Sequence, residues 1–196
     1  MMAKGATGRT PSVLNTLSGR FLMLTVAFVM LAEVLIFVPS VARFRADYLL
    51  LRLEKAQIAS LATLATEDLI SAELEQELLA NAGVFNVVLR RDEVRQLVLS
   101  SEIPEPIFAT YDLRMAGPWT LIRDAMAQIA DPGNHVVRVI GNPVQEAGLL
   151  IEITIETAPL RAALIDYGLR ILALSALISA VTALLLFLAV RHLLVM

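Results

Sequence analysis

The sequence contains no cysteine and only two histidines among its 196 residues. The lack of cysteine excludes disulfide bonds, thiolate metal sites, cysteine nucleophiles and iron–sulfur clusters. With His135 and His192 as the only imidazoles, we expect no multi-histidine metal site within one chain. We find no Ser-His-Asp set, phosphate-binding glycine loop or metal motif of convincing spacing. The sequence therefore offers no catalytic residues, and we expect no cofactor or metal to bind to these residues.

Charge is also scarce. Only 18% of the residues are charged and 57% are hydrophobic, and the mean hydropathy of +0.71 is far above that of an ordinary soluble domain. The net charge is -3 and no run of Lys or Arg occurs, which excludes the basic surface of a nucleic-acid-binding protein. Because the apolar excess lies near the two ends, we expect both ends to contact membrane lipid.

Two apolar segments predict transmembrane helices. Residues 171 to 190 contain no charge, Gly or Pro, and at about 1.5 Å per residue they are long enough to cross roughly 30 Å of hydrocarbon. Residues 21 to 42 form the second segment, which only Glu33 and Pro39 interrupt.

Basic residues flank both segments on the same side. Lys4, Arg9 and Arg20 precede the first segment without an acidic residue, and Arg191 follows the second. The excess of positive charge on cytoplasmic loops predicts that both termini are cytoplasmic. The expected order is a tail (1–20), a first transmembrane helix (21–42), an extracytoplasmic domain (43–170), a second transmembrane helix (171–190) and the start of a cytoplasmic linker (191–196).

An alternative interpretation makes the first segment a cleaved signal peptide, because Ser40-Val41-Ala42 resembles a signal-peptidase site. The apolar run is longer than the roughly 7 to 15 residues of a signal core, and it contains a carboxylate. We therefore expect the helix to be retained.

The region between the segments alternates helical and strand patterns. Helical spacing continues from the first segment to about residue 65, with Phe44, Tyr48, Leu51, Ile58 and Ala62 on one face. Ser71 and the following glutamates predict the start of a short helix that ends at Gly83. The remaining prediction is a hairpin of strands at 84–90 and 94–100, a loop at 101–118, a helix at 119–130, strands at 135–141 and 149–156, and a helix from Pro159 into the second segment.

This order predicts an α+β domain with a small antiparallel sheet, whose long first and last helices continue into the membrane. In the last strand, isoleucines alternate with Glu152, Thr154 and Glu156, which predicts one face in water. The layout is that of a PAS-like or Cache-like sensor module. The analogy concerns the fold and identifies no ligand.

Glu33 is the most informative residue of the first segment, because an ionisable side chain near the bilayer centre costs about 2.5 to 3.5 kcal/mol unless it is neutralised or paired. At the same depth, the second segment carries a stripe of small polar residues, Ser175, Ser179 and Thr182. We predict that Glu33, in its protonated form, hydrogen-bonds to this stripe in its own chain or in a dimer mate. The alternative is a carboxylic acid that only tilts toward water at the outer leaflet.

A second group of candidates surrounds the predicted loop of the outer domain. Tyr111, Arg114, Trp119 and Arg123 offer guanidinium groups and an aromatic wall for a small anionic ligand. Surface arginines and a single core tryptophan explain the same residues without a ligand. His135 lies at a strand start, where a turn or edge histidine is expected rather than a metal ligand or pH sensor.

Three stretches carry a resemblance to a known family. They are residues 18–45, beginning SGRFLMLTVAFVMLAE, residues 121–126 (LIRDAM) and residues 151–180, beginning IEITIETAPLRAALIDYG. With the spacing between them, they resemble the N-terminal input half of alphaproteobacterial two-component sensor histidine kinases. The resemblance covers nearly the whole chain.

This resemblance implies an architecture and a set of partners. In such kinases the second span leads into a HAMP linker, a dimerising helix pair with the phospho-accepting histidine, and a domain that binds ATP and Mg²⁺. Arg191-His192-Leu193-Leu194 looks like the start of that linker, and His192 lacks the glutamate that follows a phospho-acceptor. We expect no kinase core within these residues. The resemblance therefore implies a kinase fragment in the bacterial inner membrane, with a periplasmic sensor domain, a homodimeric state, and a response regulator reached only through the missing half.

Two other functions remain open at this point. The chain also fits a stand-alone membrane scaffold or envelope-assembly protein, and the input half of a chemoreceptor or cyclase. A transmitting role is favoured on physical grounds, because two continuous helices that leave a folded domain can carry a small piston, tilt or rotation across the bilayer.

Overall fold

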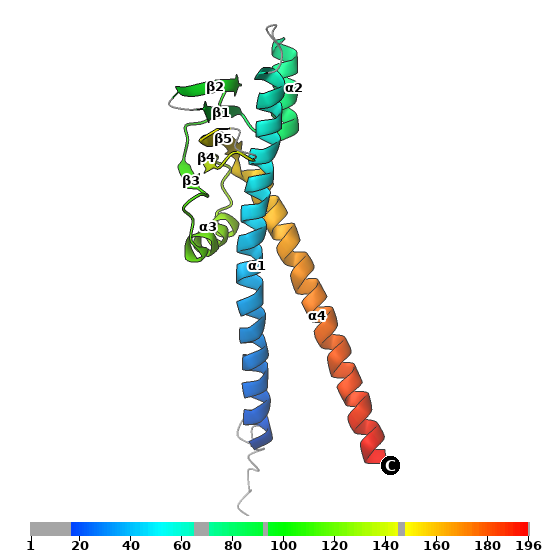
Figure 1. The fold of residues 1–196 in the computed structure, drawn as a ribbon. Coiled ribbons are helices and arrows are strands. Elements are labelled where there is room, and N and C mark those ends of the chain that lie inside the picture. Colours follow the sequence, from blue (N-terminus) through cyan, green and yellow to red (C-terminus); the bar gives the residue numbers. More distant parts are fainter. Residues whose placement is uncertain (1–16, 65–70, 92–93, 145–147, 196) are drawn as a thin grey trace, which may run out of the picture. The chain divides into compact units, whose positions relative to one another are not determined.

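The computed structural model describes residues 17–64, 71–91, 94–144 and 148–195 (Figure 1). Its elements are, in chain order, α1 (Leu17–Leu64), α2 (Ala72–Ala82), β1 (Asn86–Arg91), β2 (Val94–Ser100), β3 (Ala109–Asp112), α3 (Pro118–Ala130), β4 (Val136–Gly141), β5 (Leu150–Glu156) and α4 (Thr157–Val195). The chain divides into two units, which meet between Phe37 and Val38 and are described separately.

The described part of the first unit is the N-terminal stretch of α1. Its large apolar side chains are exposed all round the helix: Leu24, Phe28, Val29, Met30, Leu31, Val34, Leu35 and Ile36. A helix that is hydrophobic on every side is suited to lipid or to the interior of a large protein. The stretch Ala27–Thr63 is long and apolar enough to cross a membrane.

In the second unit α1 continues without a break past Pro39 to Leu64, as the sequence predicts. The apolar spacing noted in the sequence does not coincide with the buried face of α1. Leu51 and Ile58 are 50% and 64% exposed. The buried side chains of α1 are Val41, Ala42, Arg45, Leu49, Leu53, Ala56, Gln57, Ala59 and Ser60.

The domain is built on a five-stranded sheet in the order β2-β1-β5-β4-β3. β1 pairs antiparallel with β2 and β5, and β5 pairs antiparallel with β4. Alternate residues of these strands form the core: Val87, Leu89, Val137, Val139, Ile151, Ile153 and Ile155. The α+β class and the hairpin of β1 and β2 are confirmed.

Two details of the predicted sheet are wrong. The predicted loop at 101–118 contains β3, which pairs with β4 in parallel, so the sheet is not purely antiparallel. Thr154, expected to face water, is 2% exposed, and the Glu152 side chain is 13% exposed. β5 lies between β1 and β4, where a long neighbouring side chain such as Arg138 shelters its polar face.

The short helices follow their local signals. The Ser71 side chain accepts a hydrogen bond from the backbone N–H of Leu74 at the start of α2, and Gly83 ends the helix in the left-handed conformation. Pro118 occupies the first turn of α3, where its missing N–H costs nothing. Both helices therefore lie within a residue or two of their predicted positions.

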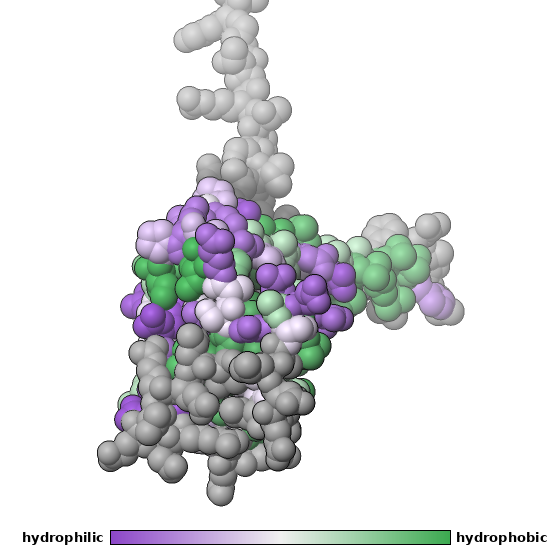
Figure 2. Space-filling view, turned by 90° about the horizontal axis from the view of Figure 1, so that it is seen from above, coloured by the Kyte–Doolittle hydropathy of each residue, from purple (hydrophilic) through white to green (hydrophobic). Residues whose placement is uncertain are grey.

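α4 begins immediately after β5, with no intervening loop. Leu160 and Leu164 in its first turns are buried, whereas large apolar side chains farther along the helix are exposed, among them Leu174, Leu177 and Ile178. The stretch Thr157–Thr182 is long and apolar enough to cross a membrane. Figure 2 shows the same contrast, with hydrophilic residues spread over the domain and apolar residues along α4.

Candidate functional site

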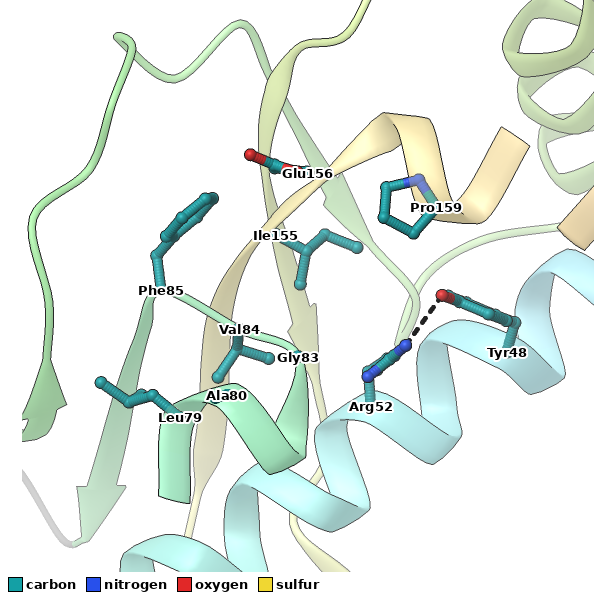
Figure 3. A pocket seen from close by; sticks show the side chains of 10 residues that line it. All are labelled: Tyr48, Arg52, Leu79, Ala80, Gly83, Val84, Phe85, Ile155, Glu156 and Pro159. Carbon is teal, nitrogen blue, oxygen red and sulfur yellow. Dashed lines mark hydrogen bonds between the residues drawn. The ribbon is translucent and has the colours of Figure 1, made fainter. Parts of the chain in front are cut away.

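A cleft of about 260 Å³ opens where α1, the end of α2, the segment between α2 and β1, the end of β5 and the first turn of α4 meet (Figure 3). Its lining is Tyr48, Arg52, Leu79, Ala80, Gly83, Val84, Phe85, Ile155, Glu156 and Pro159. Both long helices of the chain therefore contribute to its wall.

Arg52 holds the polar side of the cleft together. Its Nη1 donates a hydrogen bond of 2.8 Å to the carbonyl oxygen of Ala82, and its Nη2 donates one of 3.0 Å to the Tyr48 hydroxyl. The guanidinium thus places a positive charge at the C-terminal end of α2, where the helix dipole favours it. This contact ties α2 to α1.

Gly83 is required at the position where α2 ends. Its φ of 66° lies in the left-handed region, and a Cβ there would clash with Nη1 of Arg52. Its backbone N–H donates to the carbonyl oxygen of Ala80. The glycine lets the guanidinium approach the helix end closely.

The two sides of the cleft differ chemically. Figure 3 shows Tyr48 and Arg52 on α1 at one side and Phe85 and Glu156 at the other, with Ile155 between them. Donors at one wall, a carboxylate at the opposite rim and an apolar floor suit a small molecule with a polar end and an apolar body. Sequence reasoning missed this site, because its residues come from three regions of the chain that are far apart: α1, residues 79–85 and residues 155–159.

A second unusual group lies deeper in the domain. Arg45 on α1 is 1% exposed, and none of its three side-chain nitrogens has a hydrogen-bond partner among the described residues. Its guanidinium carbon lies 4.4 Å from the centroid of the Tyr111 ring. Burial lowers the pKa of Arg45, while Tyr111 and Asp124 act in the opposite direction. An arginine nevertheless stays protonated, so a cation is buried beside an aromatic face.

The four residues of the predicted ligand loop do not converge. Tyr111 lies against Arg45, as described above. Arg114 makes a two-pronged pair with Asp112, at 2.9 and 2.7 Å, which holds the pKa of Asp112 below its usual range. Trp119 is 83% exposed and so is not a core residue. Arg123 is exposed and pairs with its neighbour Asp124 at 3.0 Å.

His135 lies just before β4, which is an inner strand of the sheet between β5 and β3. Its ring stacks on Phe108 with centroids 4.3 Å apart, and its Nε2 lies 3.2 Å from a carboxylate oxygen of Asp131. Among the residues that the structure describes, no group of three or more His, Asp or Glu side chains is arranged to hold a metal ion.

The predicted membrane contact falls on two different units. Glu33 belongs to the first unit, whereas Ser175, Ser179 and Thr182 belong to the second. Within α4 the Thr182 hydroxyl donates to the carbonyl oxygen of Ile178 at 2.8 Å. The contact between Glu33 and the stripe stays a prediction.

No protein-family model, curated protein or solved structure matches this chain.

Proposed function

We propose that this chain is the membrane-bound signal-input region of a two-component sensor histidine kinase. The observation that carries the proposal is the continuity of its two long helices. α1 runs as one helix from an apolar stretch into the core of the domain, and α4 leaves the sheet directly after β5 and becomes apolar. A change in the domain therefore has two rigid paths along which it can reach the membrane.

The cleft in Figure 3 is the part of the domain best placed to receive a signal. Tyr48 and Arg52 belong to α1, and Pro159 belongs to the first turn of α4. A ligand that contacts all three would favour one relative position of the two helices, because its binding free energy depends on the geometry of the wall. The proposed role of the cleft is to convert ligand binding into helix displacement.

A clasp below the cleft joins the same two helices. The Tyr167 ring stacks on Phe44 with centroids 4.1 Å apart and an interplanar angle of 10°. The Tyr167 and Ser40 hydroxyls lie 2.9 Å apart in a hydrogen bond. Displacement in the domain would pass through this contact toward the membrane.

The proposal includes the topology and the partners that the sequence suggests. Both termini lie in the cytoplasm, the middle domain lies in the periplasm, and the chain forms a homodimer in the inner membrane. A HAMP linker and a kinase core that binds ATP would act on the response regulator. A sheet that lies between two long helices in the chain supports a PAS-like or Cache-like sensor module. The parallel pair of β3 and β4, which α3 connects, is a feature particular to this domain.

The experiment is a chimera in which residues 1–190 are joined to the HAMP linker and kinase core of a characterised sensor kinase. One to four alanines are inserted after Leu188, each rotating the following helix by about 100° and lengthening it by about 1.5 Å. We expect autophosphorylation to rise and fall with the number of inserted residues. The matched control carries the same insertions before residue 10 and should keep constant activity. Activity that ignores the insertions after Leu188 would contradict a transmitting role and favour a scaffold.

A further inference from the structure

The only tryptophan of the chain is on the surface of the domain. Trp119 in the first turn of α3 is 83% exposed, and Met115 just before the helix is 86% exposed. Arg123 follows Trp119 by four residues, so the two share one helix face, and its side chain is 76% exposed. An exposed aromatic beside an exposed arginine is the pattern of a helix that lies at a membrane surface.

An exposed ion pair lies next to the apolar segment on each of the two long helices. On α1, Arg43 and Asp47 pair at 3.8 Å with side chains 85% and 63% exposed, directly after the apolar segment ends. On α4, Asp166 and Arg170 pair at 2.8 Å with side chains 62% and 78% exposed, directly before the uncharged segment starts. Four exposed charges are expected outside the hydrocarbon, so they mark its outer boundary on both helices.

α3 slopes toward this boundary. Its C-terminal end lies beside Arg161, whose Nε donates to the carbonyl oxygen of Ile129 at 3.1 Å. Arg161 is nine residues before Arg170, or about 13 Å above the boundary along α4. From that end the helix runs lower, below the strands (Figure 1).

The N-terminal end of α3 is therefore the end closest to the boundary. Figure 1 agrees, since α3 lies beside the part of α1 that is nearest to Val38, below the strands. The headgroup layer on each side of a bilayer is roughly 5 to 8 Å thick. A tryptophan placed at this height reaches into that layer.

We propose that the start of α3 is a third membrane contact of the chain, in which Trp119 and Met115 enter the lipid headgroup layer and Arg123 binds lipid phosphate. The proposal rests on the membrane crossing in the proposed function. An indole at this depth keeps its ring in an apolar environment and its N–H in a wet one, which water alone does not offer. The contact fixes the height of the domain, so that α1 and α4 shift relative to a domain anchored on the bilayer.

The test uses the fluorescence of Trp119 in the full chain, reconstituted into nanodiscs. Lipids brominated close to the headgroup should remove at least roughly half of the emission, lipids brominated near the chain end should remove less, and iodide in the buffer should quench weakly. Quenching by iodide without quenching by brominated lipid would overturn the proposal. Protection from both quenchers would also overturn it, because another protein surface would then cover the tryptophan.

Two single-tryptophan variants, both carrying Trp119→Phe, calibrate the depth. Phe28→Trp, in the middle of the predicted span, should be quenched most by deep bromine. Val144→Trp should respond to iodide alone, because the backbone of Val144 is hydrogen-bonded to Gln57, about 21 Å beyond Arg43 along α1. If Phe28→Trp is not quenched by brominated lipid, the membrane crossing fails. If brominated lipid quenches Phe28→Trp but does not quench Trp119, the membrane crossing stands and only the third contact is wrong.

Discussion

Arg45 shows how a single buried charge shapes the inner end of the domain. Its guanidinium is buried without a hydrogen-bond partner among the described residues, and the Tyr111 ring lies 4.4 Å from it. Burial of a charge without a hydrogen-bond partner costs several kcal/mol. The cation–π contact with Tyr111, about 2 kcal/mol when desolvated, and the Asp124 carboxylate offset part of that cost. Arg45 therefore contributes little to stability, and its contact with the Tyr111 ring sets the position of α1 against β3.

Arg45→Met should leave the full chain in detergent as stable as the original or make it more stable, because methionine fills the space without a charge. Tyr111→Leu should cost about 1 to 3 kcal/mol in the original chain and about 1 to 2 kcal/mol less in the Arg45→Met background. Chemical unfolding followed by circular dichroism measures both changes. A loss of more than about 3 kcal/mol in Arg45→Met would show that the guanidinium has a strong partner.

Gly83 is the residue at which the structure predicts the most harm from one added methyl group. Gly83→Ala forces a positive φ on alanine and displaces the Arg52 guanidinium from the end of α2. We expect a loss of about 1 to 3 kcal/mol, measured by thermal unfolding. Gly117→Ala is the control, because φ there is -75° and an added Cβ meets nothing within 4 Å. Equal losses in the two variants would contradict the proposed role of Gly83.

At the scale of whole elements, the clasp between α1 and α4 makes a graded prediction. Tyr167→Phe removes the hydrogen bond with Ser40 and keeps the stack on Phe44, so the loss should be about 0.5 to 1.5 kcal/mol. Tyr167→Ala also removes the ring and should cost about 3 to 5 kcal/mol. Ser40→Ala should match Tyr167→Phe, and the double variant should add little to either. Additive losses would mean that the two hydroxyls do not act together.

The contact between the two apolar segments can be tested by disulfide formation, because the chain has no cysteine of its own. Glu33→Cys with Ser179→Cys should oxidise readily in membranes, within a chain or between dimer mates. The control pair is Glu33→Cys with Leu184→Cys. Leu184 lies about 7 Å farther along the second helix than Ser179, so this pair should oxidise slowly. Disulfide formation is read from mobility on gels. Equal oxidation rates for the two cysteine pairs would contradict the predicted contact between Glu33 and the stripe.

Local signals in the sequence explain which elements could be predicted. α2 carries its own start at Ser71 and its own stop at Gly83, and α3 has Pro118 in its first turn, so the sequence alone predicts both helices. β3 spans only Ala109–Asp112 and pairs in parallel with a strand that follows α3. No local pattern marks such a strand, because its partner is brought to it by the fold.

The packed face of α1 and the cleft were missed for a related reason. The buried stripe of α1 includes Arg45, so apolar spacing alone points to the neighbouring face with Leu51 and Ile58. Trp119 was assigned to the core or a ligand loop because tryptophan is usually well buried. The cleft around Arg52 depends on three distant regions of the chain meeting in space, and periodicity along the chain does not reveal such a meeting.

At the scale of the whole molecule, two helices each contain a part packed in the domain and a stretch apolar enough to cross a membrane. Helical signals without a break predicted their continuity correctly, and the structure adds the features that join them. These are the cleft around Arg52, the clasp at Tyr167 and the start of α3 close to the boundary. The cleft and the clasp both join α1 to α4 within the unit that begins at Val38.

The most direct measurement is the accessibility of single cysteines to a membrane-impermeant maleimide in intact spheroplasts. Val144→Cys, on the 46% exposed Val144 of the domain, should be labelled at once. Gly5→Cys in the tail should be labelled only after lysis, because both termini are predicted to lie inside. Labelling of Gly5→Cys from outside, or of Val144→Cys only after lysis, would contradict a periplasmic sensor domain held between two membrane helices.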